Sequence, residues 1–193
     1  MISDEVQTGF GRTGYLMGHE HDLKGVNPHI QTVAKSMSGG VTPTSGILCN
    51  DDIMMQIKPG EHGSTYGGNP LSMAVAKRAI EVLFEEKMIE NSRDMGNYLH
   101  SKTSSLKSPL IKEVRGRGLF QGVELRHDLH VNGTDLTKLM FAKGMISKST
   151  HDYCVRLTPA LVINKQEVDD GFEILEKSLQ ELEVINNERS AKK

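Results

Sequence analysis

A short apolar run that ends in a lysine places the strongest constraint on this sequence. Residues 30 to 34 read as a buried strand, and Lys35 follows them directly, ahead of residues 36 to 40, most of which are small. Two of those small residues are glycines, which leave the backbone beside the amine open. An amine held at a strand end suits covalent attachment to a carbonyl compound. Most lysines are solvated surface charges, so the neighbouring segments decide between these interpretations.

Composition excludes several classes of function. The chain has 193 residues, 37% of them hydrophobic and 25% charged, which is ordinary for one or two globular domains with a real core. A net charge of -2 gives no reason to expect nucleic acid or an anionic membrane as partner. No apolar run is long enough to cross a bilayer. Cys49 and Cys154 lie far apart and match no metal or disulfide spacing, so we interpret them as reduced, packed thiols.

The first residues read as the end of a strand that enters a polar loop. Asp4 and Glu5 stand at that point, and a solvated turn is the simplest interpretation of both, since these residue types are mostly exposed. A glycine-punctuated loop follows at residues 10 to 15. His19 and His21 lie two apart, but no carboxylate or cysteine pattern completes a metal site. We therefore predict that the histidines are structural and that the chain binds no metal.

A second glycine-rich segment covers residues 61 to 70, just ahead of a predicted helix. It contains the hydroxyls of Ser64 and Thr65. Hydroxyls and free backbone N–H groups near a helix start form an anion site. A plain connecting loop is the alternative, because glycine-rich stretches commonly serve as connections.

Periodicity predicts two unlike domains. Apolar residues at three- and four-residue spacing predict helices at about 71–85, 90–105, 134–143 and 165–186. Short strands are expected at 114–125 around a glycine bend, at 145–147 and at 154–157. Residues 1–89 then resemble part of a parallel α/β sheet, and residues 90–193 a smaller α+β unit that ends in a flexible polar tail, 186–193.

Four motifs in this order resemble those of the class III pyridoxal-phosphate-dependent aminotransferases. They are Asp4–Gly9 with Gly11–Gly14, Ala34–Ser36 with Ser38–Gly40, His62–Pro70, and Arg156–Ile163. Within this class, residues 57 to 70 look most like the ornithine aminotransferases. The resemblance extends to about residue 185 and implies an α/β fold of type I. Residues 1–89 would be the C-terminal part of the large cofactor-binding domain, with a mostly parallel sheet, and residues 90–193 the small C-terminal α+β domain.

The resemblance implies roles for three residues around a cofactor, pyridoxal 5′-phosphate. Lys35 would bond to the cofactor aldehyde and later act as the base that shuttles a proton. Asp4 would pair with the pyridine nitrogen and keep it protonated. Gln7 would hydrogen-bond the phenolic oxygen of the ring.

Further roles concern the phosphate and the substrate. In the family, the hydroxyl of Thr65 reaches the cofactor phosphate across a dimer interface, with Ser64 beside it, so a homodimer is expected. Arg156 would bind the α-carboxylate of an amino acid or 2-oxo acid substrate in bidentate fashion. Its neighbours Val155 and Leu157 alternate with it and read as buried, so an arginine that only faces solvent is the alternative.

The activity implied is transfer of the δ-amino group of ornithine to 2-oxoglutarate, which gives glutamate semialdehyde and glutamate. An acetylornithine-type or 4-aminobutyrate-type transaminase is the runner-up, and a non-catalytic truncated homologue is a third alternative. In the family, the ring-stacking residue, the main phosphate loop and the groups that receive the distal amine precede the Asp4 motif. We therefore expect a C-terminal fragment that is inactive alone, from a cytoplasmic or mitochondrial enzyme.

Overall fold

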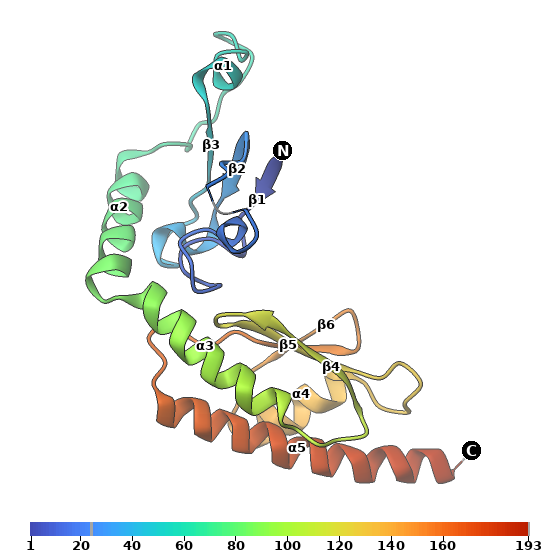
Figure 1. Cartoon of the computed structure of the whole chain (residues 1–193). Coiled ribbons are helices and arrows are strands. Elements are labelled where there is room, and N and C mark those ends of the chain that lie inside the picture. The colour runs from blue at the N-terminus through green and yellow to red at the C-terminus, as the bar shows by residue number, and fades with distance from the viewer. Residues whose placement is uncertain (24, 193) are drawn as a thin grey trace. The chain divides into compact units, whose positions relative to one another are not determined.

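The computed structural model describes residues 1–23 and 25–192, which divide into two compact units, Met1–Glu90 and Asn91–Lys193. The elements of the first unit are β1 (Ile2–Asp4), η1 (Gly18–His21), β2 (Ile30–Val33), η2 (Lys35–Ser38), β3 (Gly46–Cys49), α1 (Asp51–Met54) and α2 (Pro70–Glu85) (Figure 1). Helix α3 (Met88–Ser104) leads into β4 (Ile111–Arg117), β5 (Phe120–Leu125), α4 (Gly133–Ala142), β6 (Lys148–Thr150), β7 (Cys154–Leu157) and α5 (Lys165–Ala191).

The first unit is built on a three-stranded sheet in the order β1-β2-β3. Strands β1 and β2 are parallel, with Asp4 opposite Thr32, whereas β3 runs antiparallel to β2. Residues 5–23 and 25–29 lie in the long crossover that a parallel pair requires, and residues 34 to 45 turn the chain back to make β3. The prediction of a mostly parallel sheet was therefore wrong for these three strands, which form one parallel and one antiparallel pair.

Helix α2 supports the segment that begins at Lys35. The side chain of Asn69 caps the helix by accepting the Ser72 N–H, and Pro70 occupies the first helical position, where its missing N–H costs nothing. The helix predicted at 71–85 is confirmed within one residue. Its inner side contacts η2, and a Cβ on Gly39, the residue after η2, would lie 3.4 Å from Ala79. The helix therefore backs the lysine-bearing turn.

The second unit is an antiparallel sheet with helices on one face. Its strand order is β4-β5-β7-β6, and every neighbouring pair is antiparallel. Alternate residues of the two central strands are buried, namely Val123, Leu125, Val155 and Leu157. The helices complete this core with apolar side chains from α3 (Leu99), α4 (Leu136, Met140) and α5 (Val168, Leu175, Leu179, Leu182). Period-two strands and helices with an apolar stripe thus meet in one core.

Two segments of this unit differ from the structure expected from the sequence. The strand expected at 145–147 lies at Lys148–Thr150 instead, because Gly144 adopts a positive φ of 94° and the Met145 N–H bonds to Met140 at the end of α4. The flexible tail expected from residue 186 is helical through Ala191. Arg189 holds it by ion-pairing with Asp135 at 2.9 Å.

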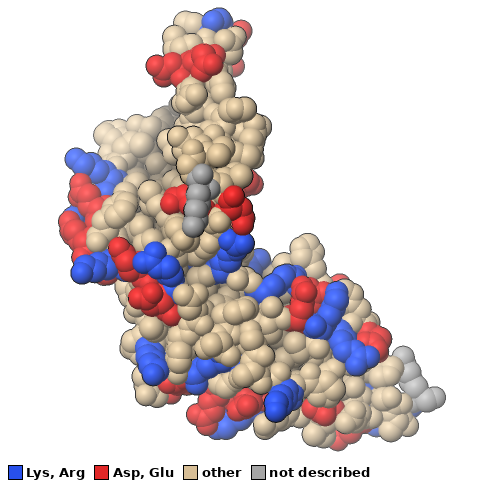
Figure 2. All heavy atoms as spheres, viewed as in Figure 1, with Lys and Arg blue, Asp and Glu red and all other residues tan. Residues whose placement is uncertain are grey.

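The surface carries charges of both signs. Figure 2 shows Lys and Arg side chains interspersed with Asp and Glu on the face that is drawn. Among the residues that the structure describes, no helix combines the length and the apolar character needed to span a membrane.

Candidate active site

Two strand ends bring the predicted amine and carboxylate to one edge of the first sheet. Asp4 is the last residue of β1, and Lys35 follows the last residue of β2 by two positions. Because β1 and β2 are parallel, their carboxyl ends meet at the same edge. In sheets of this kind, ligands bind outside the carboxyl ends of the strands.

Lys35 is exposed and its backbone is in an unusual conformation. Its φ is 45°, in the left-handed region that residues other than glycine rarely adopt. Backbone strain of this kind persists only where the surroundings impose it, and it concentrates at functional sites. The Nζ atom donates a hydrogen bond of 2.5 Å to the Oε1 atom of Gln7. The structure thus joins Lys35 and Gln7, which are far apart in the sequence, through a neutral acceptor.

Asp4 presents a carboxylate with one oxygen held and one open. Its Oδ1 atom accepts the Val6 N–H at 3.0 Å and the Thr32 hydroxyl at 3.2 Å. Among residues 1–23 and 25–192, no hydrogen bond to Oδ2 is found, and the side chain is exposed. An ionised carboxylate is an acceptor only, so Oδ2 is available to a donor from outside the chain.

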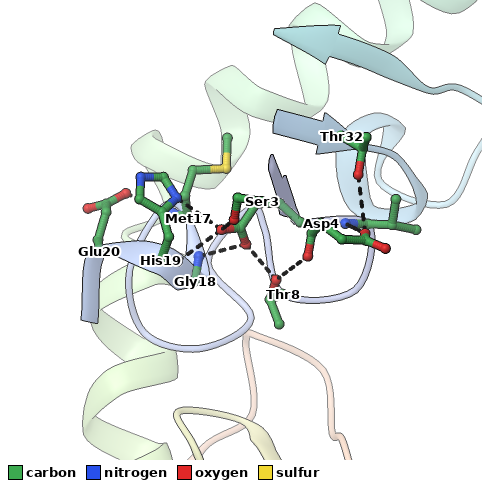
Figure 3. A network of polar contacts seen from close by, with 10 residues as sticks. Ser3, Asp4, Thr8, Met17, Gly18, His19, Glu20 and Thr32 are labelled. Carbon is green, nitrogen blue, oxygen red and sulfur yellow. Dashed lines mark hydrogen bonds and ion pairs between the residues drawn. The ribbon is translucent and has the colours of Figure 1, made fainter. Parts of the chain in front are cut away.

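Glu5, the residue next to Asp4, lies in the opposite environment. It is 1% exposed, and its two oxygens accept hydrogen bonds from Ser3, Thr8, Gly18 and His19 (Figure 3). Burial alone would raise the pKa of Glu5, but hydrogen bonds from the Thr8 hydroxyl and from the backbone N–H groups of His19 and Gly18 lower it to about 2. Glu5 is therefore a buried anion at neutral pH. The interpretation of Glu5 as part of a solvated turn was wrong, and only the nearby hydroxyls and glycines could have indicated a buried acceptor.

Ser64 and Thr65 lie on the exposed loop between α1 and α2. The Ser64 hydroxyl accepts the Gly67 N–H at 2.9 Å, which shapes the loop ahead of the helix. Both side chains are exposed. In the part of the chain that the structure describes, no hydrogen bond joins either residue to Asp4, Gln7 or Lys35. The structure therefore leaves these two hydroxyls apart from the amine.

Arg156 belongs to the second unit, on β7. The strand alternation buries Val155 and Leu157 and turns Arg156 to the other face of the sheet, where it is half-buried. The guanidinium lies 5.9 Å from the centre of the Phe120 ring and donates to the Thr150 hydroxyl at 3.2 Å. Stacking on a ring and a fixed hydrogen bond both orient the planar guanidinium. Arg156 also borders a cavity of about 430 Å³ lined mainly by apolar side chains of α5 and of the segments 145–146 and 157–163.

The histidines near the first sheet serve as hydrogen-bonding residues. His19 bonds Glu5 through Nδ1 at 3.0 Å, and His21 bonds the Thr13 carbonyl at 2.9 Å. Within residues 1–23 and 25–192, no group of three or more His, Cys, Asp or Glu side chains could hold a metal ion.

Comparison with known protein families identifies the family of this chain. The model of the family described as "Aminotransferase class-III" matches residues 1–179. The chain belongs to the class III aminotransferases. Members of this class use pyridoxal 5′-phosphate.

Named relatives of this class III aminotransferase chain point to one subgroup. A probable mitochondrial ornithine aminotransferase of Caenorhabditis elegans is 44% identical over 178 residues, which are 92% of this chain and 41% of the relative. Among solved structures, the ornithine aminotransferase of Toxoplasma gondii, crystallised with partial occupancy of pyridoxal phosphate at its active site, matches with a TM-score of 0.89 and 39% identity. That match covers 98% of this chain and 44% of the other. The chain thus spans less than half the length of these relatives.

A third protein similar to this chain is an aminotransferase named for a different substrate, acetylornithine. The acetylornithine aminotransferase of Elizabethkingia anophelis matches with a TM-score of 0.85 and 41% identity, over 93% of this chain and 47% of that one. Both structural matches confirm that the α/β elements described above are those of this aminotransferase class.

Proposed function

We propose that the whole protein binds pyridoxal 5′-phosphate and transfers the δ-amino group of ornithine to 2-oxoglutarate, giving glutamate semialdehyde and glutamate. The observation that carries this proposal is the group formed by Asp4, Gln7 and Lys35 at one edge of the first sheet. The similarity to ornithine aminotransferases over 92% of the chain supports the choice of substrate.

The residues present fit this cofactor. Oδ2 of Asp4 is open and can accept a hydrogen bond from a protonated ring nitrogen. Gln7 contacts the amine through Oε1, which leaves its amide N–H groups to donate to a ring oxygen. The Ser64 and Thr65 hydroxyls and the backbone N–H groups ahead of α2 suit a phosphate.

When bound, pyridoxal phosphate supplies an aldehyde that bonds to amines and a ring that accepts electrons. The residues of the chain would hold the reacting groups and transfer the proton. Asp4 would hold a proton on the ring nitrogen. Nζ of Lys35 would bind the aldehyde carbon before the substrate arrives, and would then take the proton from the amine-bearing carbon of the substrate and deliver it to the former aldehyde carbon.

The subunit arrangement proposed for the whole protein is a homodimer in which Ser64 and Thr65 contact the phosphate held by the other subunit. Exposed apolar side chains of the first unit support it, namely Ile47, Leu48, Met55, Tyr66 and Leu71. An exposed set of this size is typical of an interface. The name of the C. elegans relative supports the mitochondrial alternative of the two compartments expected above.

The choice of amine donor is tested by a direct comparison. We expect the whole protein, loaded with pyridoxal phosphate and given 2-oxoglutarate, to show a higher kcat/KM with ornithine than with N-acetylornithine or 4-aminobutyrate. The measurement is glutamate formation with each donor. A preference for N-acetylornithine would favour the second candidate, which the Elizabethkingia anophelis structure supports. No transfer with any donor would leave the non-catalytic alternative.

Arg156 is proposed to bind the substrate α-carboxylate, and its exchange for lysine tests that role. Lysine keeps the charge but loses the planar fork and the stacking on Phe120. We expect Arg156→Lys to raise KM for the amino acid by about 10- to 100-fold, because a bidentate charged contact is worth about 1.5–3 kcal/mol. The measurement is steady-state kinetics with ornithine as the varied substrate.

A matched control is Arg126→Lys, since Arg126 is an exposed arginine of the same unit that pairs with Asp128. It is expected to leave KM unchanged. An unchanged KM in Arg156→Lys as well would mean that Arg156 only faces solvent.

A further inference from the structure

Glu5 is a buried carboxylate for which the proposed chemistry has no direct use. Its Oε1 atom accepts the Ser3 hydroxyl at 2.9 Å and the His19 N–H and ring nitrogen at 2.9 and 3.0 Å. Its Oε2 atom accepts the Thr8 hydroxyl at 2.5 Å and the Gly18 N–H at 2.8 Å (Figure 3). Burying a charge is unfavourable unless hydrogen bonds compensate it, and here both oxygens are compensated.

These contacts close a turn around Gln7. The carboxylate of Glu5 holds the Thr8 side chain, and the carbonyl of Glu5 accepts the Gly9 N–H at 3.0 Å. The Glu5 N–H donates to the Thr32 carbonyl at 2.9 Å, which ties the same residue to β2. Gln7 therefore lies inside a segment that Glu5 fixes from both ends, and its side chain ends 2.5 Å from the Lys35 amine.

The space around Glu5 leaves the turn little freedom. A Cβ on Gly18 would lie 2.8 Å from Cβ of Thr8 and 3.0 Å from Oε2 of Glu5. A Cβ on Gly9 would lie 2.9 Å from the Glu5 carbonyl oxygen. Such approaches are closer than van der Waals contact, so both positions need glycine, and the loop from residue 9 to residue 18 packs directly on the carboxylate.

We infer that Glu5 is a positioning residue that holds Asp4 and Gln7 in the geometry needed to bind pyridoxal phosphate beside Lys35. It acts through its neighbours, since its own side chain is buried and points to residues 8, 18 and 19. This role rests on the proposed function, in which Asp4 and Gln7 contact the cofactor ring. Groups in a binding site must be held closely by their supporting contacts to be effective.

The test is Glu5→Gln in the whole protein. Glutamine has the same shape, but its amide nitrogen is a donor and faces donors from Thr8 and Gly18, so one side of the network is lost. We expect affinity for pyridoxal phosphate, measured by absorbance titration, to fall about tenfold or more. We also expect faster amide hydrogen exchange at residues 6 to 9 in the protein without cofactor.

The matched control is Glu124→Gln. Glu124 is 9% exposed and accepts hydrogen bonds from Lys112, Arg115 and His127, which lower its pKa to about 2, but it lies in the second unit. The variant Glu124→Gln also removes a carboxylate that hydrogen bonds stabilise. We therefore expect it to reduce thermal stability, while cofactor affinity and amide hydrogen exchange at residues 6 to 9 stay unchanged. Thr8→Val, which removes one contact of Glu5, is a milder second variant and should shift both readouts in the direction of Glu5→Gln.

Distinct outcomes separate the two claims. If the wild-type protein takes up no pyridoxal phosphate, the proposed function is wrong, and the exchange at residues 6 to 9 still decides whether Glu5 orders the turn. If Glu5→Gln and Glu124→Gln both lower stability while cofactor affinity and exchange at residues 6 to 9 stay unchanged, Glu5 contributes to folding alone and the inference is overturned.

Discussion

Lys35→Ala is expected to lower the turnover number of the whole protein by about 10⁴-fold or more while the chain remains folded. The Lys35 side chain is exposed, and its amine contacts Gln7 at the edge of the sheet, so truncation removes little packing. It does remove the amine that must hold the aldehyde carbon and later move the substrate proton. The measurements are glutamate formation from ornithine and circular dichroism of the variant.

A matched control comes from the same unit. Lys58 is also exposed, and its amine donates to the Met55 carbonyl at 2.8 Å. Lys58→Ala should keep full turnover. Borohydride reduction of the loaded protein followed by peptide mapping should place the cofactor label on the peptide that contains Lys35. A label on the Lys58 peptide would show that the wrong lysine anchors the proposed site.

The fold could be predicted best where local patterns in the sequence decide the structure. The helices α2 and α5 begin within one residue of the predicted positions, because an apolar stripe and a capping residue, Asn69 or Asn164, both mark the start. Local patterns could not show that β3 runs antiparallel to β2, because strand direction depends on the path of residues 34 to 45 in space. They also missed the last turn of α5, which Arg189 stabilises through an ion pair with a residue 54 positions away.

The residues of the candidate site also divide into those that the sequence indicated and one that it did not. Motif resemblance singled out Lys35, Asp4 and Gln7, and the structure places Gln7 against Lys35 although they lie 28 positions apart in the sequence. It did not reveal Glu5, because a glutamate beside a turn reads as solvated. The burial of Glu5 depends on the return of Gly18 and His19 to its carboxylate, a tertiary contact that only folding creates.

A second large effect is expected from Gly96→Ala, which should lower the free energy of unfolding of the second unit by about 3 kcal/mol or more. Gly96 lies in the buried side of α3, where an added Cβ would overlap the backbone of Gly118. The amide of Gln121 ties the two glycines together by donating to both carbonyls, at 2.7 and 2.9 Å. Backbone atoms cannot move aside as a flexible side chain can, so the helix must shift. Thermal unfolding of the full chain should show Tm lowered by about 10 °C.

The control is Gly171→Ala, the same exchange at another helical position, for which we expect the opposite effect on stability. Gly171 also lies within a helix of the second unit, α5, but a Cβ there would meet only the Met145 side chain, at 3.9 Å. Alanine is the better helix former by about 1 kcal/mol, and this site has room for it, so Tm should rise by about 3 °C. Two Gly-to-Ala exchanges in helices of one unit should therefore have opposite signs. Equal stability of both variants would contradict the close packing of α3 on Gly118, because helix propensity favours alanine at both positions and only the overlap at residue 96 opposes it.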